Sequence, residues 1–224
     1  MMINKKTLQF LKDIKTNNNR EWFEKKKENY IEAKDDFEKF VQQVLIQLSK
    51  FDPEIKELQA KNCTYRQYRD VRFSKDKSPY KIHMGAYINR GGKKSLYGGY
   101  YFHLEPGNKS FLGGGLWVPM APELKKVRQE VDYCFDEFNK IVTGSKFKKI
   151  YSGLIDNDEM KLKTNPKGYT GDNPAIEFLK HKSFVAKRSV SDAELMNPDL
   201  LKNTIEAFKT LKPLLYFINR SIEV

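Results

Sequence analysis

The sequence contains only two cysteines and three histidines among its 224 residues. Cys63 and Cys134 lie far apart, with no CxxC spacing and no companion cluster of histidines. This pattern indicates neither a structural zinc site nor a disulfide framework. So little cysteine is typical of a chain in a reducing compartment, and we therefore expect a cytoplasmic location.

Long hydrophobic runs are also missing. Residues 1–15 carry a charge every few positions, so we expect neither a secretory signal nor a membrane-spanning segment there. Hydrophobic residues still make up 39% of the chain and aromatic residues 13%, which is enough for a packed core. The composition therefore favours a folded protein without a membrane partner.

Familiar catalytic motifs are absent as well. The sequence has no P-loop, GxSxG or GxGxxG motif. Ser74 with Lys77, and Ser78 with Lys81, fit the SxxK pattern of acyl-transferring enzymes, but Pro79 argues against the helix that this chemistry needs. We therefore expect no cofactor, and the sequence does not identify a reaction.

The histidines do not predict a metal site. Metal coordination by His83 or His103 would need carboxylates that the pattern does not bring together with them. We interpret His83, His103 and His181 as structural residues, with His83 an additional candidate for a site beside Lys81. No metal is expected.

Positive charge is concentrated in one part of the chain. The formal net charge is +12, and residues 61–100 contain ten basic but only two acidic residues. A general excess for solubility would be spread along the whole chain. A local excess of this kind indicates an anionic partner.

The spacing of apolar residues predicts an α+β fold. Apolar residues at intervals of three and four predict a short helix over 7–15, a long helix over 22–48 with Asn18 and Glu21 as its capping box, and a helix over 122–142. Period-two patterns predict strands over 64–73, 81–89, 97–105 and 110–118, with short turns that favour antiparallel pairing. Further along the chain we expect a strand over 159–163, an edge strand over 183–189 and a terminal helix after Pro198.

We therefore predict one α+β domain over residues 1–224, in which a central antiparallel sheet packs against N-terminal and C-terminal helices. Residues 1–60 are expected to be helical, residues 63–118 to form the sheet core, and residues 119–224 to be mixed and helical. The paired glycines at 98–99 and the three at 113–115 predict bulges or close approaches of the backbone.

The segment YRDVRFSKDKSPYK (residues 68–81) is the best candidate for a functional site. Two arginines for one carboxylate leave guanidinium donors over, and such donors suit phosphate or carboxylate groups. The SKDKSP turn adds hydroxyl and backbone N–H groups of the kind that hold anions. We predict a pocket for a small anion, with these ligand-binding residues: Arg66, Arg69, Asp70, Arg72, Lys77, Tyr80, Lys81 and His83. In this site Tyr80 forms a wall, and Asp70 orients an arginine.

Three alternatives stay open. The first is a structural network of ion pairs among the charged residues. A nucleic-acid-binding module is the second alternative, because seven of the twelve tyrosines lie in the basic region and could stack on bases. The third is a scaffold whose basic sheet meets an acidic protein.

The sequence also resembles a known family, the domain of unknown function 2461, over nearly its whole length. The resemblance rests on NNNREWF with Lys27 and Tyr30, and on YRDVRFSKDKSPYK, GYYFHLEPG, FLGGGLWVP and NPKGYTGDNPAIEFLK. It implies that YRDVRFSKDKSPYK is a signature segment. It implies no activity and no catalytic residues.

Overall fold

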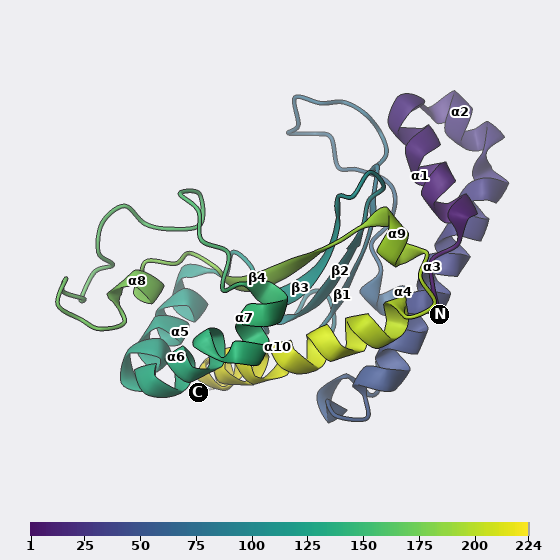
Figure 1. Ribbon diagram of the computed structural model, residues 1–224. Coiled ribbons are helices and arrows are strands. Elements are labelled where there is room, and N and C mark those ends of the chain that lie inside the picture. Colours follow the sequence, from purple (N-terminus) through teal and green to yellow (C-terminus); the bar gives the residue numbers. More distant parts are fainter. Residues whose placement is uncertain (224) are drawn as a thin grey trace. The chain divides into compact units, whose positions relative to one another are not determined.

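The computed structural model describes residues 1–223 and contains helices at both ends of the chain and a four-stranded antiparallel sheet (Figure 1). The strands are hydrogen-bonded in the order β1 (Met84–Ile88), β2 (Gly99–Leu104), β3 (Ser110–Leu116) and β4 (Phe184–Val190). The predicted α+β class is confirmed. The predicted strand over 183–189 is also confirmed, since β4 lies at one edge of the sheet.

Contacts between residues divide the described chain into two compact units. The first unit comprises Met1–Ile88, Tyr101–Leu112 and Ser189–Glu206. The second comprises Asn89–Tyr100, Gly113–Arg188 and the described residues from Ala207 onward. None of the described helices is long and apolar enough to cross a membrane.

The N-terminal helices of the first unit bury the apolar residues whose spacing predicts helices over 7–15 and 22–48. The helices of this unit are α1 (Lys5–Thr16), α2 (Arg20–Lys25), α3 (Lys27–Leu48), the 3-10 helix η1 (Pro53–Ile55), α4 (Ala60–Cys63) and α9 (Asp192–Leu195). Helix α3 packs against α1 and β1, and the rings of Phe37 and Phe40 contact Phe102 of β2. The long helix predicted over 22–48 is divided at Lys26, where neither proline nor glycine marks the break.

The predicted capping box at Asn18 is wrong. Asn19 is the N-cap of α2, because its side chain accepts a hydrogen bond from the Trp22 amide. The Asn18 side chain instead bonds both backbone groups of Tyr80, accepting from its N–H at 3.0 Å and donating to its carbonyl at 2.9 Å. Asn18 therefore pairs two distant segments in the way that a neighbouring strand would.

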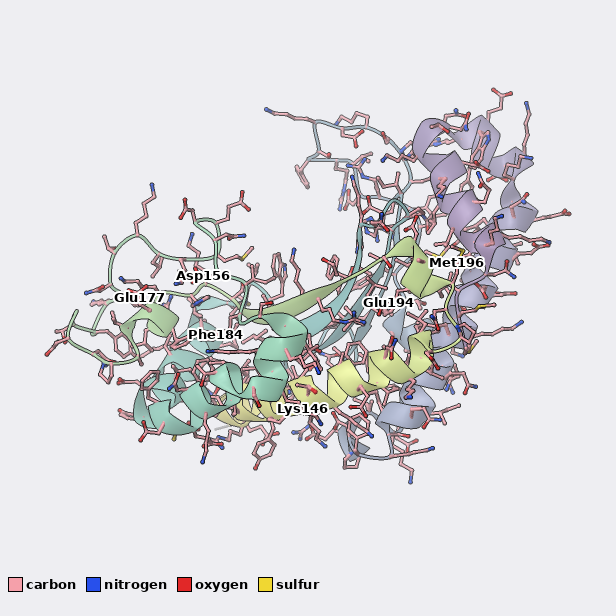
Figure 2. The ribbon with its side chains drawn as sticks, in the orientation of Figure 1. Lys146, Asp156, Glu177, Phe184, Glu194 and Met196 are labelled. Carbon is pink, nitrogen blue, oxygen red and sulfur yellow. The ribbon has the colours of Figure 1, made fainter. Side chains whose placement is uncertain are left out.

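The second unit is built around an aromatic cluster. Its helices are α5 (Ala121–Tyr133), α6 (Phe135–Thr143), α7 (Ser145–Tyr151) and α8 (Ile176–Leu179), together with most of α10 (Leu200–Glu223). The Phe138 ring lies 5.2 to 6.0 Å from the rings of Phe178, Phe184 and Phe217 (Phe184 is labelled in Figure 2). The helix predicted over 122–142 is interrupted at Cys134, and Pro213 lies inside α10 without ending it.

Two predicted strands do not form. In place of a strand over 64–73 there are single bridges, from Thr64 to Ala86 and from Tyr68 to Tyr80. Polar side chains in this segment bond nearby backbone groups, as when Asp70 accepts from the Arg72 amide, and such local bonds compete with a strand ladder. The strand predicted over 159–163 is reduced to a bridge between Lys161 and His181.

Close backbone approaches occur where the glycines predict them. A Cβ atom at Gly113 or Gly115 would overlap a carbonyl oxygen of β4, and one at Gly114 would overlap the carbonyl oxygen of Gly99 in β2. The turn between β2 and β3 has positive φ angles at Gly107 and Asn108. Asp192 accepts hydrogen bonds from the backbone amides of both turn residues, which fixes the turn in the first unit.

Candidate functional site

Residues 66–81, here called the basic loop, hold two of the predicted site arginines in ion pairs. Arg72 bonds Asp70 with two nitrogens, Nε to Oδ1 at 3.0 Å and Nη2 to Oδ2 at 2.7 Å. Arg69 pairs with Asp76 and also donates to the Ser78 carbonyl at 3.2 Å and the Ser74 hydroxyl at 3.3 Å. Both arginines therefore stabilise the shape of the loop itself.

Both carboxylates of the basic loop are fully engaged. Hydrogen bonds from the Ser78 hydroxyl and amide, together with Arg69, lower the pKa of Asp76 to about 2. The Arg72 guanidinium and amide hold the pKa of Asp70 below its ordinary value. Neither carboxyl group is suited to act as a general base near neutral pH, because each is stabilised in its ionised form.

The other predicted cations have different surroundings. Lys77 donates to the Val71 carbonyl at 3.1 Å, and Lys81 donates to the Arg66 carbonyl at 3.0 Å while its ammonium lies over the Tyr65 ring. Within residues 1–223, no salt bridge joins a carboxylate to Arg66, Lys75 or Lys77. Arg66, Lys75 and Lys77 are exposed side chains.

Tyr80, predicted as a wall of the site, is a core residue. Its side chain is 2% exposed, and its ring stacks on Phe23 at 3.9 Å between centroids and 11° between planes. Tyr68 and Phe23 also contact each other, so this packing attaches the start and end of the basic loop to α2. Tyr80 therefore anchors the loop to the core and does not face a ligand.

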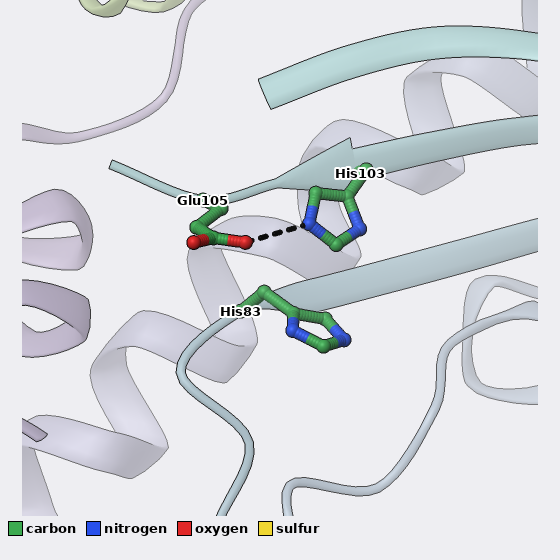
Figure 3. A group of neighbouring side chains, drawn as sticks. All are labelled: His83, His103 and Glu105. Carbon is green, nitrogen blue, oxygen red and sulfur yellow. Dashed lines mark hydrogen bonds and ion pairs between the residues drawn. The ribbon is translucent and has the colours of Figure 1, made fainter. Parts of the chain in front are cut away.

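The last predicted site residue, His83, belongs to a cluster that the sequence interpretation did not assemble (Figure 3). His83 directly precedes β1, His103 lies on β2, and Glu105 directly follows β2. One ligand atom from each of the three side chains lies within 4.8 Å of the others. The adjacent strands β1 and β2 thus bring together two imidazoles and one carboxylate.

Hydrogen bonds fix the His103 ring within this cluster. Its Nε2 lies 3.1 Å from Oε2 of Glu105, and its Nδ1 lies 3.3 Å from the Tyr101 hydroxyl. The ring also stacks on Phe111 at 4.6 Å. Space for the Tyr101 hydroxyl comes from Gly85, where a Cβ atom would lie only 2.6 Å from that oxygen.

The cluster is partly buried, and its His83 imidazole favours the neutral state. Burial lowers the pKa of His83 to about 4, with further contributions from His103, Lys81 and Arg69. Burial also raises the pKa of Tyr101 to about 12. Neutral imidazole nitrogens are the form of histidine that coordinates metals.

The expectation that no carboxylate converges with the histidines is therefore wrong. His103 and Glu105 are two residues apart, so extended backbone places both side chains on one face. That H-x-E spacing is visible in the sequence. The contribution of His83 depends on which strands pair and in which register, and single-sequence periodicity does not reveal this.

Comparisons with known proteins place the chain by family. No curated protein and no solved structure matches it. A family model described as "conserved hypothetical protein" matches residues 6–217, a range that includes the basic loop and the His83–His103–Glu105 cluster. The chain belongs to this family, the domain of unknown function 2461.

Proposed function

We propose that the protein binds a small anionic compound, bearing phosphate or carboxylate, at the basic loop. The observation that carries this proposal is the charge balance of the loop. Six cations lie between Arg66 and Lys81, against two carboxylates that Arg69 and Arg72 already engage. Cations held close together repel one another, so a bound anion would stabilise the folded loop.

The cations divide into two roles in this proposal. Arg69 and Arg72 hold the loop in shape through Asp76 and Asp70. Arg66, Lys75 and Lys77 supply the charge that faces the ligand, and Lys81 joins the loop to the edge where His83 lies. A guanidinium fork with two ammonium groups is well suited to a phosphate or carboxylate group.

A small ligand is favoured over a nucleic acid by the burial of the tyrosines. Binding of single strands requires exposed aromatic rings on which successive bases stack. Of the seven tyrosines in the basic region, only Tyr65 and Tyr68 are exposed, at 43% and 46%. Both rings also make contacts within the fold, Tyr65 with Lys81 and Tyr68 with Phe23 and Tyr80.

The proposal is tested by thermal unfolding in phosphate and in chloride at matched pH and ionic strength. A ligand that binds only the folded state at ten times its Kd stabilises it by about 1.4 kcal/mol. For a chain of this size we expect the Tm to rise by about 3–6 °C in phosphate. A variant with Arg66, Lys75 and Lys77 all changed to alanine should lose most of this rise.

A matched control removes the same charge elsewhere. Lys5, Lys15 and Lys140 are exposed and lie outside the loop, so changing these three to alanine should preserve the phosphate effect. An equal loss in both triple variants would show a general charge effect and contradict the proposal. So would a wild-type Tm that is the same in both salts.

Nucleic-acid binding gives a different result. With six phosphate contacts, log K for an oligonucleotide would fall with log salt at a slope of roughly −5. Such a slope, together with competition by oligonucleotide against phosphate, would replace the small ligand with a nucleic acid as the partner.

A further inference from the structure

We infer that His83, His103 and Glu105 form a binding site for one divalent transition-metal ion. The inference does not rest on the anion proposed above, since none of the three ligands is a cation of the basic loop. Its support comes from the geometry of the three side chains and from the chemistry of the donor set.

The geometry needs only small movements to receive an ion. The three ligand atoms lie within 4.8 Å of one another. Ligands in a tetrahedral site with bonds of about 2.1 Å are separated by about 3.4 Å. Rotation about the side-chain torsions of His83 and Glu105 can close this difference, because both residues lie at strand ends and not within a strand.

The donor set matches borderline metal ions. Two imidazole nitrogens and one carboxylate oxygen suit Zn²⁺, Fe²⁺, Co²⁺ or Mn²⁺. They suit Mg²⁺ and Ca²⁺ less well, because those ions prefer sites made entirely of oxygen ligands. Three protein ligands leave at least one coordination position for water or another ligand. An anion in that position would offset the charge that the ion adds to a basic region.

The His103 ring is already oriented as a metal ligand would be. Its Nε2 points toward Glu105, and the Tyr101 hydroxyl contacts its other nitrogen (Figure 3 shows the Glu105 contact). A ligating histidine commonly has such a partner on its second nitrogen, which fixes the ring and its tautomer. If Nε2 binds the ion, the Tyr101 contact can stay in place.

A structural hydrogen bond between His103 and Glu105, without a metal ion, would explain less of the arrangement than a metal site does. The His103–Glu105 hydrogen bond accounts for two of the three residues. It leaves His83 half-buried, with its ring centroid 4.4 Å from that of His103. Among residues 1–223, the His83 ring makes no side-chain hydrogen bond, so the His103–Glu105 pair gives it no role.

The test is a calorimetric titration of the full chain, free of any histidine tag, with Zn²⁺ after treatment with a chelator. We expect one ion per chain, a Kd in the micromolar range or below, and visible absorption bands from four- or five-coordinate Co²⁺. His83→Gln and Glu105→Gln should each weaken binding by at least about tenfold, as loss of a ligand should cost no less than loss of a ligand's partner.

Two controls keep the result specific. His181→Gln removes the remaining histidine, which lies in the second unit, and should leave Zn²⁺ binding unchanged. Tyr101→Phe keeps all three ligands and should weaken binding less than His83→Gln, provided that circular dichroism shows each variant folded. Absence of saturable binding by the wild type, or an equal loss in His181→Gln, would overturn the inference.

Discussion

At the scale of single residues, Asn18 shows how one amide can replace a stretch of sheet. Its side chain has the same donor and acceptor as a peptide group, and it uses both on the Tyr80 backbone. The segment NNNREWF is thereby attached to the end of the basic loop. The packing of Phe23 on Tyr80 reinforces the same connection.

Replacing Asn18 with alanine should therefore lower the free energy of unfolding by about 1–3 kcal/mol, since two hydrogen bonds are lost and their backbone partners are part-buried. Asn17→Ala is the matched comparison, because within residues 1–223 the Asn17 side chain bonds only Asp13 and Thr16, at the end of α1. Urea denaturation of both variants measures the difference. Equal costs would mean that the Asn18–Tyr80 contact adds nothing.

His181 predicts how stability responds to acid. It is buried in the second unit, its Nδ1 has no hydrogen-bond partner in the described part of the chain, and burial, then Lys161, lowers its pKa to about 4. Asp156 and Glu177 oppose this shift. Between pH 6.5 and 4 the unfolded chain therefore binds a proton at this residue that the folded chain does not.

The free energy of unfolding should accordingly fall as the pH drops through this window, by about 1.4 kcal/mol per unit from this residue. In His181→Gln the slope against pH should be shallower, whatever the variant's stability at pH 7. Denaturant titrations at several pH values between 4 and 7 give both slopes. Identical slopes would show that His181 is protonated equally in both states.

At the scale of elements, the glycine-rich strand β3 sets the spacing of the sheet. Gly113 and Gly115 face the backbone of β4, and Gly114 faces that of β2. A side chain at any of these positions would meet a carbonyl oxygen of a hydrogen-bonded neighbour. Backbone atoms in a sheet cannot move aside as the end of a flexible side chain can.

Gly113→Ala should therefore cost about 3 kcal/mol or more, because its methyl group overlaps the Ala186 carbonyl. Gly171→Ala is the control, since the nearest atom to its Cβ would be Asn165 Nδ2 at 3.6 Å, an ordinary contact. Its stability should stay within about 0.5 kcal/mol of the wild type. Thermal melting of the two variants measures both effects on stability. A mild effect of Gly113→Ala would show that β3 and β4 can move apart to accommodate the methyl group, and would contradict this prediction.

The elements also show what the sequence can predict. Apolar spacing identifies the N-terminal helices, the strands over 81–118 and the edge strand β4. The helices α1 and α3 bury one apolar face, whereas β1 and β2 are buried at nearly every position. The basic segment 64–73 alternates in the same way, yet it forms a loop. Its arginines and aspartates bond one another and nearby backbone groups, a competition that an alternation of residue types does not reveal.

The candidate site, like the fold, is only partly predictable from the sequence. Local excess charge locates the basic loop, and the position of His83 beside Lys81 indicates it as a site candidate. The pairing of arginines with carboxylates depends on the turn that brings Arg69 close to Asp76, and residue spacing does not reveal this turn. The meeting of His83 with Glu105 depends on the pairing of β1 with β2, a long-range property.

At the scale of the whole molecule, uneven charge is the property that most directly indicates function. Residues 61–100 hold ten of the 41 basic residues but only two of the 29 acidic ones. Elsewhere, exposed lysines often pair with glutamates, as Lys25 does with Glu21 and Lys34 with Glu38. Among residues 1–223, three of the six cations of the basic loop (Arg66, Lys75 and Lys77) have no such salt bridge, and a bound anion would relieve this imbalance.

The measurement that tests this account most directly is a calorimetric titration of phosphate into the wild-type protein at constant pH and ionic strength. The account predicts saturable binding of one phosphate per chain. It also predicts that this binding is lost when Arg66, Lys75 and Lys77 are changed to alanine, and kept when Lys5, Lys15 and Lys140 are. No saturable heat in the millimolar range, or equal binding by the two triple variants, would contradict it.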